Sequence, residues 1–105
     1  AYIVDAVRTP MGRKKGTLAE IHPADLAAHP IKVLIERSGI DPALVDDCVW
    51  GCCDTVGPQA GDIGRTAWLV AGLPQHVPGT TVVERGFLVP LPRSRRAGVS
   101  FTWNF

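Results

Sequence analysis

The stretch HPADLAAHPIKVLIERSGIDPALVDDCVWGCC, residues 22–53, contains the change of hydrophobic period that decides the fold. Its first half has apolar residues at helical spacing, with a proline at the start and Gly39 at the end, which predicts a helix over residues 23–38. Because Pro30 lacks a backbone donor, we expect it to kink or split that helix. The short apolar run at residues 48–52 predicts a strand. A helix followed by a strand indicates an α/β protein.

The flanking segments predict further elements of both kinds. Residues 2–7 are β-branched and apolar, and a Pro–Gly turn follows them, so we expect a first strand there. Asp41 and the proline after it predict a short helix that runs to about Asp47. Residues 62–71 have a helical pattern, and residues 77–83 predict a third strand. The predicted order is β-α-β-α-β, with helices packed on a parallel or mixed sheet.

Composition restricts the class of protein. The chain has 105 residues, of which 46% are hydrophobic, and this is typical of one soluble domain. No apolar run reaches the roughly 20 residues of a membrane helix, and the first residues do not resemble a secretory signal. Three closely spaced cysteines, Cys48, Cys52 and Cys53, argue against a disulfide framework and for a reducing compartment. We therefore expect a cytoplasmic protein with no membrane partner.

The charge distribution changes near residue 86. Residues 1–85 contain 8 basic and 10 acidic residues, a balance of −2, whereas residues 86–105 contain three arginines and no acid, a balance of +3. The second segment is also rich in proline, and only the alternation of Phe101, Trp103 and Phe105 hints at a last strand. We predict a domain at residues 1–85 and a divergent tail at residues 86–105.

Four motifs in residues 1–85 occur together and in a fixed order. They are RTPMG (8–12), DPALVDDCVWGC (41–52), GPQAGDIGR (57–65) and VPGTTV (77–82). In this combination the chain resembles the N-terminal end of a thiolase of the acetyl-CoA acetyltransferase type. The resemblance implies a partial thiolase-like half-domain of the α/β class.

The resemblance also implies a chemistry. Thiolases cleave 3-ketoacyl-CoA with coenzyme A or condense two acyl-CoA molecules, and they are commonly homo-oligomers. The family nucleophile is a cysteine in a Cys-Gly-Ser type motif, just after the third strand and at the start of a helix, where the helix dipole favours the thiolate. A histidine and a second cysteine farther along the chain supply base and acid. Coenzyme A is a substrate, so no cofactor is expected.

This sequence departs from the family pattern at the nucleophile. Glu84 and Arg85 keep the approach to the motif, but residues 86–89 are Gly-Phe-Leu-Val. We therefore expect an acyl-CoA C-acyltransferase fragment that is inactive alone, with no catalytic, cofactor-binding or metal residue of its own. Our hypothesis is a changed reading frame or a truncated gene, because RSRR at residues 93–96 fits Gln-Gln codons read out of frame. The alternative is a non-catalytic interaction module that associates with itself or with an intact thiolase subunit.

Other reactive side chains have structural explanations that we prefer. The three cysteines could bind a metal, and Cys52 or Cys53 could replace the nucleophile, but free cysteines are commonly buried in cores. We expect His22 and His29 to be cap or surface residues and His76 to lie in a loop without a catalytic partner. For Arg65 we expect a structural salt link.

Two basic runs could bind phosphate groups. Residues 13–15, Arg-Lys-Lys, could contact coenzyme A, but a solvated loop is the simpler interpretation. The arginines at residues 93, 95 and 96 could contact nucleic acid. Without a basic fold or stacking aromatic residues in register around them, we expect no nucleic-acid partner.

Overall fold

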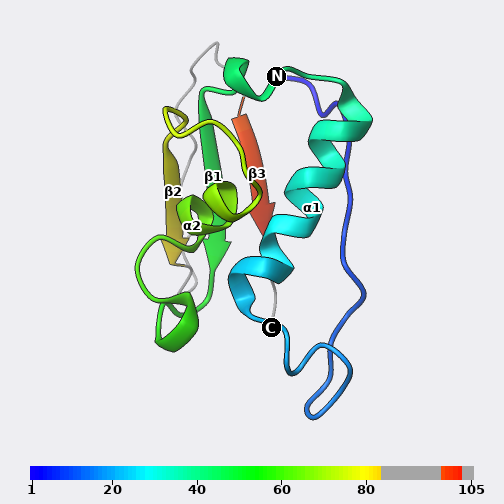
Figure 1. The fold of residues 1–105 in the computed structure, drawn as a ribbon, viewed down its shortest axis with the longest axis vertical. Helices are drawn as coiled ribbons and strands as arrows, with labels where there is room; N and C mark the ends of the chain where they lie inside the picture. Colours follow the sequence, from blue (N-terminus) through cyan, green and yellow to red (C-terminus); the bar gives the residue numbers. More distant parts are fainter. Residues whose placement is uncertain (84–97, 103–105) are drawn as a thin grey trace.

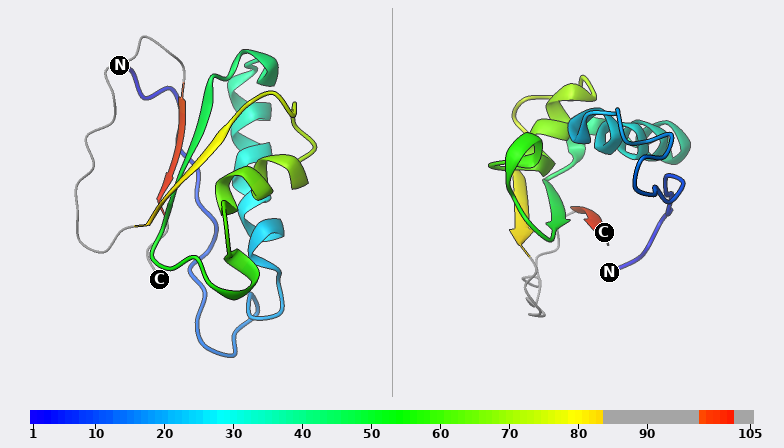
Figure 2. Two further views of the ribbon diagram at one scale, coloured as in Figure 1. Left: turned by 90° about the vertical axis from the view of Figure 1, so that its left-hand side faces the viewer. Right: turned by 90° about the horizontal axis from the view of Figure 1, so that it is seen from below.

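The computed structural model describes residues 1–83 and the backbone of a strand at residues 98–102. A parallel sheet carries two helices on one face (Figures 1 and 2). In chain order the elements are α1 (Pro23–Ser38), the 3-10 turn η1 (Pro42–Leu44), β1 (Asp47–Cys52), the 3-10 turn η2 (Gly57–Gln59), α2 (Ile63–Val70), β2 (Gly79–Val83) and β3 (Gly98–Thr102). The α/β class is confirmed.

The central strand is β1, and the strand order is β2-β1-β3. Both neighbours run parallel to β1, with Trp50 opposite Thr81 on one side and Phe101 on the other. The predicted strands at residues 48–52 and 77–83 are thus confirmed, the second with a later start. Alternate residues of β1 are buried, which places Cys48, Trp50 and Cys52 on the helix side of the sheet.

Helix α1 begins and ends where the sequence predicts. His22 caps the start, because its Nδ1 accepts a hydrogen bond from the backbone N–H of Ala24 at 3.2 Å. Gly39 has a φ of 67° and donates to the carbonyl of Ile35 at 3.2 Å. The helix continues through Pro30 as one 16-residue element, so this proline does not split it. Ile31, which is 1% exposed in the core, provides burial that offsets the one lost hydrogen bond.

The short helix expected over residues 41–47 is wrong beyond its first turn. Asp41 accepts a hydrogen bond from the N–H of Ala43 at 3.0 Å, as predicted for a cap, but only the 3-10 turn η1 forms. Val45 is buried and Asp47 already begins β1, so the chain must become extended after Leu44. Burial of Val45 and strand pairing therefore override the local helical signal.

The first strand expected at residues 2–7 is also wrong, because this described segment has no strand structure. Both edges of β1 are occupied by β2 and β3, and the segment runs along α1 instead (Figure 1). Its apolar side chains are left in solvent: Tyr2 is 97% exposed, Ile3 93% and Val4 74%. With the edges of β1 taken, this strand sequence stays extended and unpaired in the described structure.

Helix α2 lies unusually close to the sheet, and two glycines allow this. A Cβ on Gly64 would lie 2.7 Å from Cβ of Trp50, and one on Gly79 would lie 2.7 Å from the backbone of Arg65. Trp68 of the same helix is fully buried, and its indole N–H donates to the carbonyl of Pro74 at 2.8 Å. The predicted helix at residues 62–71 is confirmed, with Asp62 and Ala71 as its caps.

Candidate functional site

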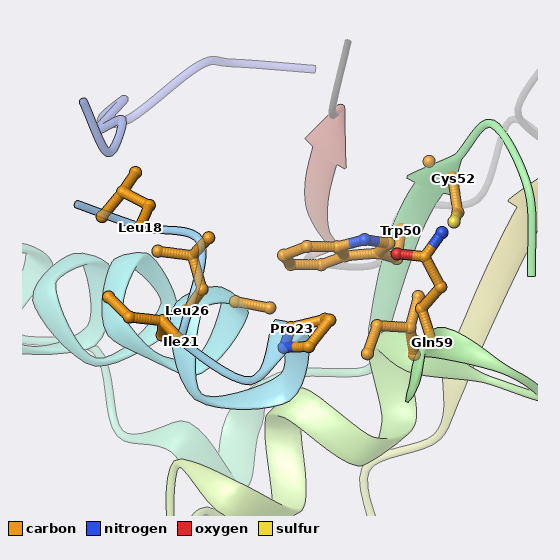
Figure 3. A pocket seen from close by; sticks show the side chains of 10 residues that line it. Leu18, Ile21, Pro23, Leu26, Trp50, Cys52 and Gln59 are labelled. Atoms are coloured by element: carbon orange, nitrogen blue, oxygen red, sulfur yellow. The ribbon is translucent and has the colours of Figure 1, made fainter. Parts of the chain in front are cut away.

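The carboxyl end of β1 and the start of α1 enclose an apolar pocket (Figure 3). Its cavity measures about 160 Å³. The lining comes from the loop before α1, from α1, from β1, from η2 and from the start of α2; its residues are Leu18, Ile21, Pro23, Leu26, Ala27, Trp50, Gly51, Cys52, Gln59 and Ile63. The end of a parallel strand is where α/β proteins commonly bind ligands. This pocket is therefore the candidate functional site among the described residues.

The pocket offers surface but little reactivity. Trp50 is 2% exposed and presents its indole to the cavity, with Pro23 and Leu26 facing it (Figure 3). Cys52 is the titratable residue in the lining, and it is 4% exposed. General acid–base or nucleophilic catalysis needs a second polar group within hydrogen-bond reach of the thiol. The lining can hold an apolar group, and it supplies no base for the thiol.

The thiol of Cys52 forms a hydrogen bond with the backbone. Its Sγ donates to the carbonyl of Asp54 at 3.1 Å, and the side-chain amide of Gln59 donates to the same carbonyl. Two donors on one oxygen fix the loop between β1 and η2. The Cys52 thiol thus positions a loop.

Cys48 lies four residues earlier on the same face of β1, about 13 Å away at the rise of an extended strand. It is fully buried, and burial, followed by the charges of Asp47 and Asp62, raises the pKa of its thiol from 9.0 to about 12. A thiol with such a pKa is neutral at physiological pH and is a poor nucleophile. Cys48 and Cys52 are core residues, as expected for structural cysteines, and Cys53 is exposed.

The amino end of α2 is closed by a side-chain network. The Asp62 carboxylate accepts from the backbone N–H of Arg65 at 3.0 Å and from the hydroxyl of Thr81. The same hydroxyl accepts from the N–H of Gly64 at 3.1 Å. Because these donors of the first turn have protein partners, they are not available to bind a phosphate.

Arg65 has a structural role, but among the described residues its partners are backbone carbonyls and not the acidic side chain that a salt link needs. Its guanidinium donates to the carbonyl of Gln75 at 2.7 Å and to the carbonyl of Val77. The loop before β2 presents these two carbonyls to α2, and the fork of the guanidinium matches them. Arg65 therefore holds the loop between α2 and β2 through neutral acceptors.

The three histidines lie apart from the pocket lining. His22 is the cap of α1, His29 is exposed on the same helix, and Nε2 of His76 lies 3.1 Å from the carbonyl of Ala43. The prediction of cap and surface histidines is confirmed. None of them is among the described residues that line the pocket with Cys52.

The basic run at residues 13–15 is an exposed turn. The N–H of Gly16 donates to the carbonyl of Arg13 at 2.9 Å, and Lys15 has a φ of 57°. This is the solvated loop that the sequence favours. The expected break in the motif at residues 86–89 and the arginines at 93, 95 and 96 lie outside the described residues.

Sequence reasoning found Cys52 but missed the pocket around it. Trp50 could have been placed from the alternation of buried residues in the strand, and Leu18 and Gln59 lie in segments without a regular period. In residues 1–83 and 98–102 we find no cluster of three residues that could hold a metal ion. Within those same ranges no helix has the length and apolar character to cross a bilayer.

Comparison with known families gives a match over most of the chain. Residues 1–85 match the family model described as the N-terminal domain of thiolase. The steroid 3-ketoacyl-CoA thiolase FadA6 of Mycobacterium tuberculosis is 55% identical over 82 residues, which are 78% of this chain and 20% of that protein. The beta-ketoadipyl-CoA thiolase of Acinetobacter baylyi is 51% identical over 83 residues, 78% of this chain and 21% of that protein.

A solved structure agrees with these relatives. The acetyl-CoA acetyltransferase of Bacillus anthracis superposes with a TM-score of 0.68 at 34% sequence identity, and the match covers 77% of this chain and 20% of that one. The chain spans about a fifth of the length of the relatives that it matches.

Proposed function

Because the chain belongs to the thiolase family, we propose that its parent protein transfers acyl groups between coenzyme A thioesters. The reaction would cleave a 3-ketoacyl-CoA with coenzyme A or form it by the reverse condensation. The observation that carries this proposal is the match of residues 1–85 to the N-terminal domain of thiolase, with 55% identity to a 3-ketoacyl-CoA thiolase.

The 105-residue chain contributes scaffold to this reaction and no nucleophile. Its cysteines are all in or next to β1, and the sequence after β2 contains none. Cys48 is buried with a raised thiol pKa, and Cys52 is bonded to a backbone carbonyl. Cys53 is exposed, but it follows β1, whereas the family nucleophile is expected after the strand at residues 79–83. We therefore infer that these 105 residues are catalytically inactive alone.

The environment of the parent protein follows from the same reasoning. We propose that it is a cytoplasmic homo-oligomer that takes coenzyme A and acyl-CoA as substrates and needs no further cofactor. Three closely spaced cysteines that no disulfide joins to one another are typical of a reducing compartment.

The test of inactivity uses the purified chain and two readouts. Thiolysis of acetoacetyl-CoA should be undetectable, and intact mass after incubation with acetoacetyl-CoA should show no acetylated protein. Circular dichroism on the same sample should show a folded α/β protein, so that the inactivity is not due to unfolding. An acetyl adduct on any of the three cysteines would refute the proposal.

The test of the parent activity uses the gene. The coding sequence from codon 77 onward should be translated in all three frames. A Cys-Gly-Ser motif in a shifted frame near codon 86, followed by later histidine and cysteine motifs, is the expected result. The rejoined protein should then cleave acetoacetyl-CoA, and failure to do so would contradict the proposal.

The second candidate function is a non-catalytic interaction module, favoured by the exposed apolar side chains of Tyr2, Ile3 and Val4. Such a surface on a small domain promotes association. Light scattering after gel filtration distinguishes the cases, because a module gives a defined dimer and an incomplete domain gives a broad distribution. Mixing with an intact thiolase subunit then tests for the mixed assembly.

A further inference from the structure

The segment at residues 2–7 lies outside the sheet although its sequence has strand character. Tyr2, Ile3 and Val4 are almost wholly in solvent. The segment is joined to the last turn of α1 by an ion pair between Asp5 and Arg37 at 3.1 Å, and the arginine side chain is 56% exposed. A cavity of about 330 Å³ lies between the segment and α1. This arrangement buries little and holds the segment weakly.

Topology provides a second place for the same residues. The chain runs from residues 2–7 through α1 into β1, and from β1 through α2 into β2. Both helices cover the same face of the sheet and pack together (Figure 2). Parallel β-α-β connections are right-handed, so two successive connections over one face step across the sheet in the same direction. A strand at residues 2–7 would therefore lie at the edge of β1 opposite β2.

That edge is occupied by β3. The pairing runs from Asp47 opposite Gly98 to Gly51 opposite Thr102. The match to the thiolase N-terminal domain includes residues 2–7, but it ends at residue 85 and does not include β3. At the start of this seam, Oδ1 of Asp47 is buried and has no hydrogen-bond partner among the described residues. In the observed arrangement one buried acceptor has no described partner, and three apolar side chains are in water.

We propose that residues 2–7 and β3 are alternative partners for the same edge of β1. The chain then has two sheet arrangements, one with β3 at the edge and one with residues 2–7 in its place. Insertion of residues 2–7 turns either Ile3 or the pair Tyr2 and Val4 towards the helices, because successive side chains of a strand face opposite sides, and it completes a β-α-β unit over α1. The relative populations of the two sheet arrangements depend on their difference in free energy, which comes from apolar burial and strand pairing. This inference does not rest on the proposed catalytic function.

The experiment measures amide hydrogen exchange in the full 105-residue chain. A variant with Val99→Pro and Ser100→Pro removes two successive amides of β3. Because successive amides of a strand point to opposite sides, one of the two faces β1 whatever the exact register. We expect exchange at residues 3–7 to slow by roughly 100-fold in this variant, while α1, β1 and β2 keep their protection.

Matched variants complete the test. Ile3→Pro alone should leave the protection of β1 unchanged, because β3 still occupies the edge. Ile3→Pro added to the β3 variant should expose the amides of β1 that face this edge. Residues 3–7 that exchange at peptide rates in the β3 variant would overturn the proposal. With such exchange, the proposal would be overturned in either of two cases. If β1 stays protected, its edge is empty; if β1 loses protection, residues 2–7 cannot replace β3.

Discussion

The unit β1–α2–β2 and the segment before α1 differ in how tightly they are packed. In the first, Gly64 and Gly79 bring backbone and Cβ atoms so close that a methyl group would not fit. In the second, a Cβ on Gly12 would lie 3.6 Å from the side chain of Leu18, which is ordinary contact, and the close contact at Gly16 is with Arg13 of its own turn. One region is constrained by its neighbours inside the described chain. The other has apolar side chains that find no such neighbours.

This chain thus has one packed core and, beside it, a segment whose apolar side chains are in solvent. Cys48, Trp50, Ala67 and Trp68 are each 2% exposed or less and belong to one cluster. Residues 2–4 belong to no cluster and are exposed. Equivalent changes in the two regions should therefore have very different effects on the free energy of unfolding.

The largest effect is expected for Trp68→Ala. The side chain is fully buried and donates a hydrogen bond, so its loss should cost about 3–5 kcal/mol. Urea unfolding followed by circular dichroism at 222 nm measures this, since the chain holds other tryptophans that complicate fluorescence. Tyr2→Ala, an aromatic truncation at a 97% exposed site, is the control and should stay within about 0.5 kcal/mol. Equal losses in the free energy of unfolding for the two variants would contradict the difference in packing between the two regions.

Gly64→Ala should come next. The new methyl group would lie 2.7 Å from Cβ of Trp50, which is not a flexible chain end, so α2 must shift at a cost of about 1–3 kcal/mol. Gly12→Ala adds the same methyl group to the loose region and should be close to neutral. Both values come from the same urea titration. If Gly64→Ala is as stable as the unchanged protein, α2 packs less closely on β1 than described.

Alkaline pH should affect the core through Cys48. The folded thiol has a pKa of about 12 against 9.0 as its ordinary value, so the folded state retains a proton that the unfolded state releases. The contribution is fully present below pH 9 and is lost as pH rises from 9 towards 12, by at most about 1.4 kcal/mol per pH unit. Comparing Cys48→Ala with Cys53→Ala at pH 8 and pH 10 isolates this group. Only the first should flatten the dependence, and identical slopes would refute it.

The smallest effects are expected from two aspartates. Asp62→Ala removes the cap of α2 and its bond to Thr81, which should cost about 1 kcal/mol. Asp5→Ala removes the ion pair to Arg37 and should cost about 0–1 kcal/mol, less in high salt. Thermal unfolding at low and high ionic strength separates the two. A salt-independent loss for Asp5→Ala would show that the N-terminal segment is better anchored than its exposure indicates.

The sequence predicted the tight region well and the loose region poorly. Between residues 47 and 83 the periods, caps and glycines agree with one another, and β1, α2 and β2 all contact each other within this stretch. Residues 2–7 do have strand propensity, but β3 occupies the edge of β1 at which they would pair. Strand propensity indicates that a segment can pair in a sheet, but it does not determine which of two such segments occupies a given edge.

The candidate site was predictable only in part. Burial of Cys48 and Cys52 follows from the alternation of an apolar strand, and so does the position of Trp50. The two donors on the carbonyl of Asp54, and the two carbonyls bound by Arg65, depend on loop conformations that no local pattern specifies. Sequence reasoning therefore assigned Arg65 a charged partner, whereas its partners are backbone oxygens.

The contact between Gly79 and the backbone of Arg65 also works as an alignment key for the sheet. If β2 slipped by one residue along β1, Pro78 or Thr80 would take the place of Gly79 against α2. Neither side chain fits where even a methyl group would lie 2.7 Å from backbone atoms. A slip would also turn every side chain of β2 to the opposite face. A register of β2 that is shifted by one residue is thus excluded by a steric clash at the Cβ position of residue 79, whichever apolar side chains then face the core or the solvent.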